Sequence, residues 1–179
     1  LPLRAIGLIG AAGGIVGALL LIITPGETFL WIVPWLLLIA TVLFAVGPSL
    51  LKAVQTRGVK AAGVTLSGVT ILIVSIYGGY FNGGLGIMLL AAFGLIGYTN
   101  LHGMNGLKNA LSALLSLVSA VTFIAAGLIA WEHALPMAVS ATLGGYIGAR
   151  VSRRITRTDL LRYFVTAVGA IMAAVFFLR

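Results

Sequence analysis

The chain has 179 residues, of which 61% are hydrophobic and only 8% are charged, and its mean hydropathy is +1.19. A soluble domain devotes about a quarter of its residues to charged side chains, so this composition excludes a soluble fold and predicts an integral membrane protein. The net charge of +8 comes from basic residues between apolar runs, which indicates membrane topology rather than nucleic-acid binding. The sequence has no cysteine, and we expect neither a metal nor another cofactor.

Seven apolar runs follow one another along the chain, and each is a candidate membrane helix. A helix needs roughly 20 residues to cross the hydrocarbon core, so the fourth run is too short to cross it. The runs are Ala5–Ile23, Phe29–Val46, Ala61–Tyr77, Gly84–Gly97, Ala110–Ala130, Ala134–Ala149 and Leu160–Leu178.

Basic and acidic residues alternate between the connections of these runs. If the loop after the second run is cytoplasmic, every Lys and Arg except Arg179 falls on the cytoplasmic side, while Glu27 and Glu132 lie outside. This distribution is what the positive-inside rule requires. We therefore predict a multi-pass protein whose basic loops face the cytoplasm.

The first and sixth runs share a proline near their start and two glycines four residues apart. In one common register, Pro2 aligns with Pro136, Gly10 with Gly144 and Gly14 with Gly148. Because these runs cross the membrane in opposite directions, the repeat is inverted, as in many secondary transporters. Glycines at this spacing predict close helix contacts, either within the chain or in a homo-oligomer.

We predict an all-α, polytopic helical bundle with an inverted-topology repeat and a short, broken helix. Residues 1–50 would be the last two transmembrane helices of a first repeat, 51–61 a cytoplasmic basic loop, and 62–179 a complete second repeat. The first repeat then lacks counterparts of the third, fourth and fifth runs. The chain is therefore expected to be truncated at its N-terminus.

The most unusual stretch is the glycine-rich segment Tyr77–Gly86 between two apolar runs. Each glycine inside a helix costs about 1 kcal/mol relative to alanine, and broken backbone survives in a bilayer only inside protein or beside a water-filled cavity. We predict a half-helix whose free amides and positive dipole end bind an anion. The alternative is an external turn with glycines for tight packing. The candidate binding residues here are Gly78, Gly79, Asn82, Gly83, Gly84 and Gly86.

A second polar patch precedes the fifth run. Asn105 and Asn109 stand four residues apart and would share a helix face if that helix starts early, with Lys108 beside them. One cation with amide donors suits a sulfonate, sulfite or carboxylate group. The alternative is that Lys108 is an interfacial anchor and the asparagines are helix caps.

Carboxylates are scarce, because Glu27, Glu132 and Asp159 all lie at the ends of apolar runs. Their absence at membrane depth disfavours a cation site and leaves proton coupling unassigned. An intramembrane hydrolase using Ser67 or Ser75 with His102 has no GxSxG, HExxH or acidic cluster to support it.

In their order and combination, the stretches Tyr77–Gly86, Leu101–Asn109 and Leu135–Arg150 resemble the second half of the sulfite exporter TauE/SafE family. Leu1–Val46 is similar to the end of the family's first half. The resemblance implies a carrier of two inverted halves in the plasma membrane, the inner membrane of bacteria, for sulfite, sulfonates or other small organic anions. It also favours Lys108 and Asn109 as binding residues.

The predicted function is therefore secondary transport of a small anion and not enzymatic catalysis. The expected partners are the lipid bilayer and a small anionic solute, with no nucleic acid. A channel-like anion pore is the alternative.

Overall fold

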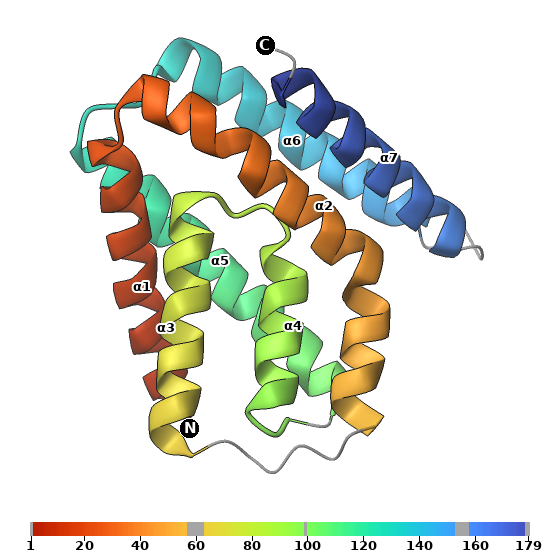
Figure 1. Cartoon of the computed structure of the whole chain (residues 1–179). Helices are drawn as coiled ribbons and strands as arrows, with labels where there is room; N and C mark the ends of the chain where they lie inside the picture. The colour runs from red at the N-terminus through yellow and green to blue at the C-terminus, as the bar shows by residue number, and fades with distance from the viewer. Residues whose placement is uncertain (1, 57–62, 99, 153–157, 178–179) are drawn as a thin grey trace.

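The computed structural model describes residues 2–56, 63–98, 100–152 and 158–177, and all regular structure in these ranges is helical. Figure 1 shows the helices in chain order. They are α1 (Leu3–Ile23), α2 (Gly26–Thr56), α3 (Val64–Tyr80), α4 (Leu85–Leu95), α5 (Leu101–Ala125), α6 (Trp131–Ser152) and α7 (Thr158–Phe177).

Three of these helices are long and apolar enough to cross a membrane. They are α1, the part of α2 over Gly26–Gly47, and the part of α5 over His102–Ala125. The apolar stretches in α3, α4 and α7 are shorter. The all-α membrane fold expected from the composition is confirmed.

Two helices extend into segments that were expected to be loops. α2 continues past Val46 to Thr56, so the first part of the expected basic loop is helical, and the remainder lies outside the described residues. α5 begins at Leu101 instead of Ala110, because the side chain of Asn100 accepts hydrogen bonds from the amides of His102 and Gly103 at 3.0 and 3.2 Å. This N-cap satisfies amides that would otherwise lack partners.

The buried core lies among α1, α3, α4 and α5, where side chains from all four helices meet. α1 lies along α3 and also contacts α5, as Figure 1 shows. The core residues are Ile6, Ile71, Val74, Leu85, Leu89, Ala92, Phe93, Ile96, Met104, Leu111 and Leu115.

α2 packs on α4 and α7 through small residues. A Cβ atom added to Gly47 would come within 2.7 Å of the Ile87 side chain, and one added to Gly169 would overlap the side chain of Thr41. In contrast, among the α6 side chains that the structure describes, only Ala134 is not exposed. Most helices therefore pack against one another, whereas α6 leaves almost all of its described side chains exposed.

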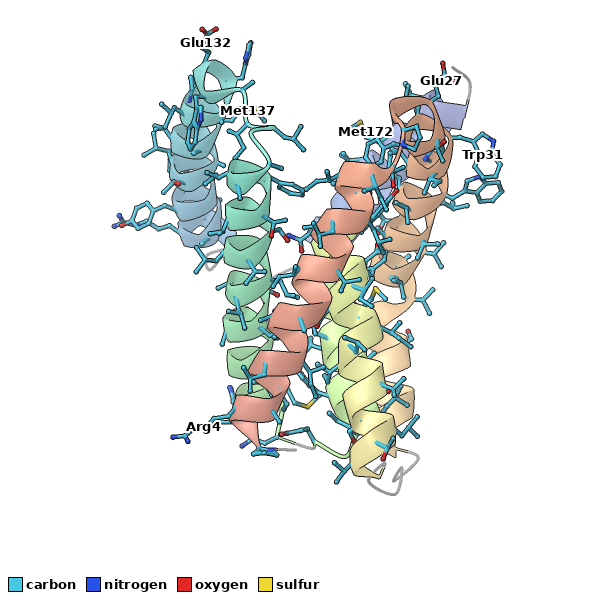
Figure 2. The ribbon with its side chains drawn as sticks, turned by 90° about the vertical axis from the view of Figure 1, so that its left-hand side faces the viewer. Arg4, Glu27, Trp31, Glu132, Met137 and Met172 are labelled. Carbon is cyan, nitrogen blue, oxygen red and sulfur yellow. The ribbon has the colours of Figure 1, made fainter. Side chains whose placement is uncertain are left out.

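Arg4 lies far from Glu27 and Glu132 along the bundle. Figure 2 places Arg4 at one end and both Glu27 and Glu132 at the opposite end. The side of the membrane on which the basic and acidic connections lie stays a prediction. Six of the basic residues lie outside the described residues, namely Arg57, Lys60, Arg153, Arg154, Arg157 and Arg179.

Candidate functional site

The glycine-rich segment does contain a helix break, but the break is shorter than expected. α3 ends at Tyr80, α4 begins at Leu85, and Phe81–Gly84 connects them. Asn82 and Gly84 have φ values of 62° and 70°, which is the left-handed region that a continuing helix cannot adopt. α4 extends only from Leu85 to Leu95, so the predicted short half-helix is present.

The expected loss of a continuous helix within Tyr77–Gly86 occurs only after Tyr80, because Gly78 and Gly79 both lie within the last turns of α3. A Cβ at Gly79 would overlap the backbone of Gly14 in α1, and one at Gly78 would lie 2.9 Å from Leu85. These glycines allow close approach of neighbouring elements, and the packing offsets their low helix propensity.

The connection lies short of the end of the bundle. A Cβ at Gly17 would overlap the Ile76 carbonyl and lie 2.8 Å from the Tyr80 amide, so α3 ends beside Gly17. α1 continues to Ile23, roughly 9 Å further at 1.5 Å per residue. Figure 1 likewise shows the α3–α4 connection short of the α1–α2 connection.

The N-terminus of α4 presents backbone amides without backbone partners. The amides of Leu85 and Ile87 donate to the carbonyls of Asn82 and Gly84 at 3.4 and 3.0 Å. Within the described ranges, no backbone carbonyl accepts from the amides of Gly83, Gly84 or Gly86. Free amides at the positive end of a helix are donors for an anion.

Lys108 from α5 lies against this helix start. Its side chain is half-buried, and a Cβ built on Gly86 would be 3.4 Å from Cδ and 4.0 Å from Nζ of Lys108. The structure therefore brings Lys108 and Gly86 together, although they are distant in sequence. Asn105 and Asn109 lie inside α5 and are exposed, and the helix cap is Asn100 instead.

Tyr77 fixes the connection from inside α3. Its hydroxyl donates to the Gly83 carbonyl at 2.6 Å, and its ring meets Phe81 edge-on at a centroid distance of 6.3 Å. The hydroxyl of Tyr80 lies 3.4 Å from Oγ1 of Thr24 and holds the end of α3 to the end of α1. These contacts stabilise the conformation of the connection between α3 and α4.

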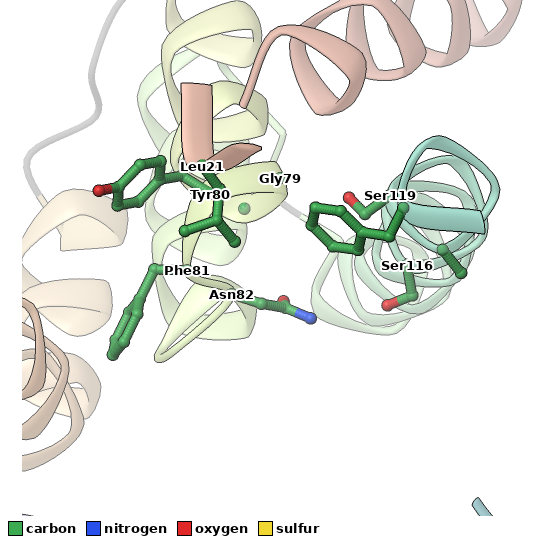
Figure 3. A pocket seen from close by; sticks show the side chains of 10 residues that line it. Leu21, Gly79, Tyr80, Phe81, Asn82, Ser116 and Ser119 are labelled. Carbon is green, nitrogen blue, oxygen red and sulfur yellow. The ribbon is translucent and has the colours of Figure 1, made fainter. Parts of the chain in front are cut away.

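A pocket of about 340 Å³ opens beside the connection, between α1, α3 and α5. Figure 3 shows the Asn82 side chain extending toward α5, which carries Ser116 and Ser119, whereas the rings of Tyr80 and Phe81 turn away. Oγ of Ser119 is buried and has no hydrogen-bond partner among the described residues. The lining residues are Leu21, Gly78, Gly79, Tyr80, Phe81, Asn82, Ser116, Ser119, Ala120 and Phe123.

Sequence reasoning missed Ser116 and Ser119. They stand three residues apart in an apolar helix, so they share one face, and this spacing was the available signal. Which helix face meets the break depends on tertiary packing, which the spacing does not give.

No arrangement for metal or hydrolase chemistry accompanies the pocket. Among the described residues, His, Cys, Asp and Glu form no group of three that could hold a metal ion. Ser67 and Ser75 are buried in α3, whereas His102 is exposed at the start of α5.

Comparison with known proteins gives two matches. Residues 2–176 match the family described as "Sulfite exporter TauE/SafE". A "Probable membrane transporter protein ORF9" from Sinorhizobium sp is 31% identical over 148 residues, which cover 80% of this chain and 54% of that relative. No solved structure matches. The chain thus spans about half the length of this curated relative.

Proposed function

Because the chain belongs to the sulfite exporter TauE/SafE family, we propose that it forms part of a secondary transporter for a small anion such as sulfite, a sulfonate or another organic anion. The observation that carries the proposal is the start of α4, where free glycine amides and Lys108 meet short of the end of the bundle. In this position the anion exchanges its hydration shell for amide donors and one cation. The name of the Sinorhizobium relative supports membrane transport.

Transport proceeds by alternating access, with the bundle moving around an anion held beside Gly83–Gly86. The protein lies in the plasma membrane, and the end that carries Arg4 faces the cytoplasm, as the positive-inside rule requires. Its partners are the lipid bilayer and the anion. An anion entering from either side meets the α4 amides, since these lie between the two ends of the bundle.

The complete transport unit contains two inverted repeats, and this chain supplies residues 62–179 as one repeat and 1–50 as the end of the other. The partial coverage of the Sinorhizobium relative supports this organisation. Sequencing the gene upstream of the codon for Leu1 tests it. We expect a second glycine-rich break there, and a full-length gene that encodes none would contradict the repeat.

The decisive experiment is flux of labelled sulfite and a panel of sulfonates and carboxylates into liposomes that contain the full-length gene product. We expect saturable flux. Lys108→Ala should lower this flux by about tenfold or more, the effect of removing one charged hydrogen-bond partner, with normal membrane insertion. The matched control is Arg4→Ala, which removes an exposed cation outside the site and should leave flux unchanged.

Two results would contradict the proposal. Absence of flux for every anion tested, with folded protein in the membrane, would contradict the proposal that the protein transports a small anion. Flux that does not saturate, together with single-channel conductance in planar bilayers, would indicate a pore instead of a carrier. Normal flux in Lys108→Ala would return Lys108 to an anchoring role at the membrane interface.

A further inference from the structure

The peptide that joins Gly83 to Gly84 leads directly into α4, which begins at Leu85. Glycines on both sides of a peptide allow it to rotate through half a turn, because neither residue has a Cβ atom that restricts its dihedral angles. Such a rotation exchanges the directions of the carbonyl and the amide and leaves the Cα atoms in place. The two glycines alone therefore do not decide which way the Gly84 amide points.

Packing fixes where the connection lies, but it does not fix the direction of this peptide. A Cβ atom on Gly83 would lie 2.5 Å from Cε1 of Phe81 and 3.4 Å from Cβ of Ala40, and one on Gly84 would lie 3.4 Å from Cα of Ala40. These contacts hold the glycine Cα atoms between the Phe81 ring and α2. Because the Phe81 and Ala40 side chains are apolar, neither of them distinguishes a carbonyl from an amide.

A hydrogen bond from Tyr77 sets the direction of the peptide. The Tyr77 hydroxyl donates to the Gly83 carbonyl at 2.6 Å. The peptide is trans and planar, so its carbonyl and its amide point in opposite directions. While Tyr77 holds the Gly83 carbonyl, the Gly84 amide therefore points away from Tyr77. No backbone carbonyl of a described residue accepts a hydrogen bond from this amide, which leaves it as a donor.

We propose that Tyr77 is a positioning residue that orients the Gly84 amide as a donor to the anion at the start of α4. The role in anion binding rests on the proposed function, whereas the direction of the peptide does not. Without the Tyr77 hydroxyl, the peptide is free to rotate, and the rotated form presents the Gly83 carbonyl where the amide was. A carbonyl oxygen repels an anion, so only the fraction of molecules with the amide in place binds it. The apparent dissociation constant rises by the inverse of that fraction.

This role predicts a kinetic signature for Tyr77→Phe, which keeps the ring and its edge-on contact with Phe81 and removes only the hydroxyl. Loss of one hydrogen bond should raise the half-saturating sulfite concentration by about three- to tenfold. Maximal flux should stay the same, because saturating anion draws the peptide back to the binding orientation. A change that only lowered the amount of folded carrier would instead reduce maximal flux at an unchanged half-saturating concentration.

The test is flux of ³⁵S-labelled sulfite into liposomes that contain the full-length gene product, measured over a range of sulfite concentrations. Tyr146→Phe is the matched control, because it removes the same hydroxyl from an exposed ring on α6, and it should change neither parameter. A second measurement needs no transport. The assigned ¹³C carbonyl resonance of Gly83, read by solid-state NMR in a lipid bilayer, should move upfield in Tyr77→Phe, because the carbonyl loses its hydrogen bond.

An unchanged half-saturating concentration in Tyr77→Phe, with or without a lower maximal flux, would overturn the positioning role and leave anion transport intact. A Gly83 carbonyl resonance at the same position in the wild type and in Tyr77→Phe would overturn the direction of the peptide. A resonance that moves in Tyr77→Phe, in a wild-type protein that transports no anion of the panel, would support that direction and contradict the proposed transport. The inference and the proposed function therefore fail separately.

Discussion

α1 and α6 carry glycines in the same register, yet their surroundings differ completely. Gly10 and Gly14 of α1 lie against the Leu111 and Leu115 side chains of α5. Their aligned partners Gly144 and Gly148 in α6 have no atom of a described residue within 4 Å of an added Cβ. The comparison teaches that a pattern of small residues predicts a face able to accept a helix closely, whereas the helix that occupies it is a property of the assembled fold.

The contact of α1 with α3 is so close that its glycines meet backbone as well as side chains. A Cβ at Gly13 would lie 2.7 Å from Cβ of Ser75 and 3.0 Å from the Leu72 carbonyl. Gly17 and Gly79 contact backbone of the opposite helix, which cannot move aside as a side-chain tip can. Substitutions along this interface should therefore have graded effects.

The largest effect is expected for Gly17→Val. The added side chain would overlap the Ile76 carbonyl and separate α1 from the end of α3, so the free energy of unfolding should fall by about 3 kcal/mol or more. Unfolding in detergent micelles, followed by circular dichroism, measures the loss. Gly7→Val is the control in the same helix, because an added Cβ there meets nothing within 4 Å. Equal losses at both positions would contradict the backbone contact.

A smaller loss, about 2 kcal/mol, is expected for Gly79→Ala, since one methyl group would overlap the backbone of Gly14. The control in α3 is Gly68→Ala, whose Cβ would lie 3.6 Å from Ile9 in ordinary contact. That change should be neutral or slightly stabilising because alanine is the better helix former. Full stability in Gly79→Ala would show that α1 and α3 are further apart in solution.

Ser75 gives a test of opposite sign at the same interface. It is fully buried beside Gly10 and Gly13, and no described residue forms a hydrogen bond with its hydroxyl. Replacing it with alanine removes an unpaired polar group, so Ser75→Ala should raise the free energy of unfolding by about 1 kcal/mol. The same unfolding assay measures this gain. A loss of stability instead would mean that the hydroxyl has a partner in the membrane.

Much of the fold follows from the sequence for physical reasons. Long apolar runs form helices in a bilayer, because a helix satisfies all of its own backbone hydrogen bonds. The small fraction of charged residues indicates a membrane protein. The helix boundaries were less predictable. α5 starts at Leu101 because Asn100 caps it, and a cap of this kind is a single side-chain contact that hydropathy does not register.

The candidate site was predicted in part. A break near Asn82 and Gly84 follows from local glycine content, and the structure has it. Gly78 and Gly79 have the same local signal but remain helical, because their role is set by Gly14 and Leu85 across the interface. Whether any of these residues binds substrate stays a prediction.

The smallest effect is expected on α6, and it sharpens the comparison most. Gly148→Ala adds a methyl group where the described chain leaves open space, so nothing opposes the helix-propensity gain and stability should rise by about 0.5 kcal/mol. Unfolding of the chain Leu1–Arg179, measured as for Gly79→Ala, gives the value. A loss as large as that at Gly79 would mean that another helix covers Gly148 in the folded protein. The glycine face of α6 would then be occupied as the face of α1 is, and the difference between the two helices would disappear.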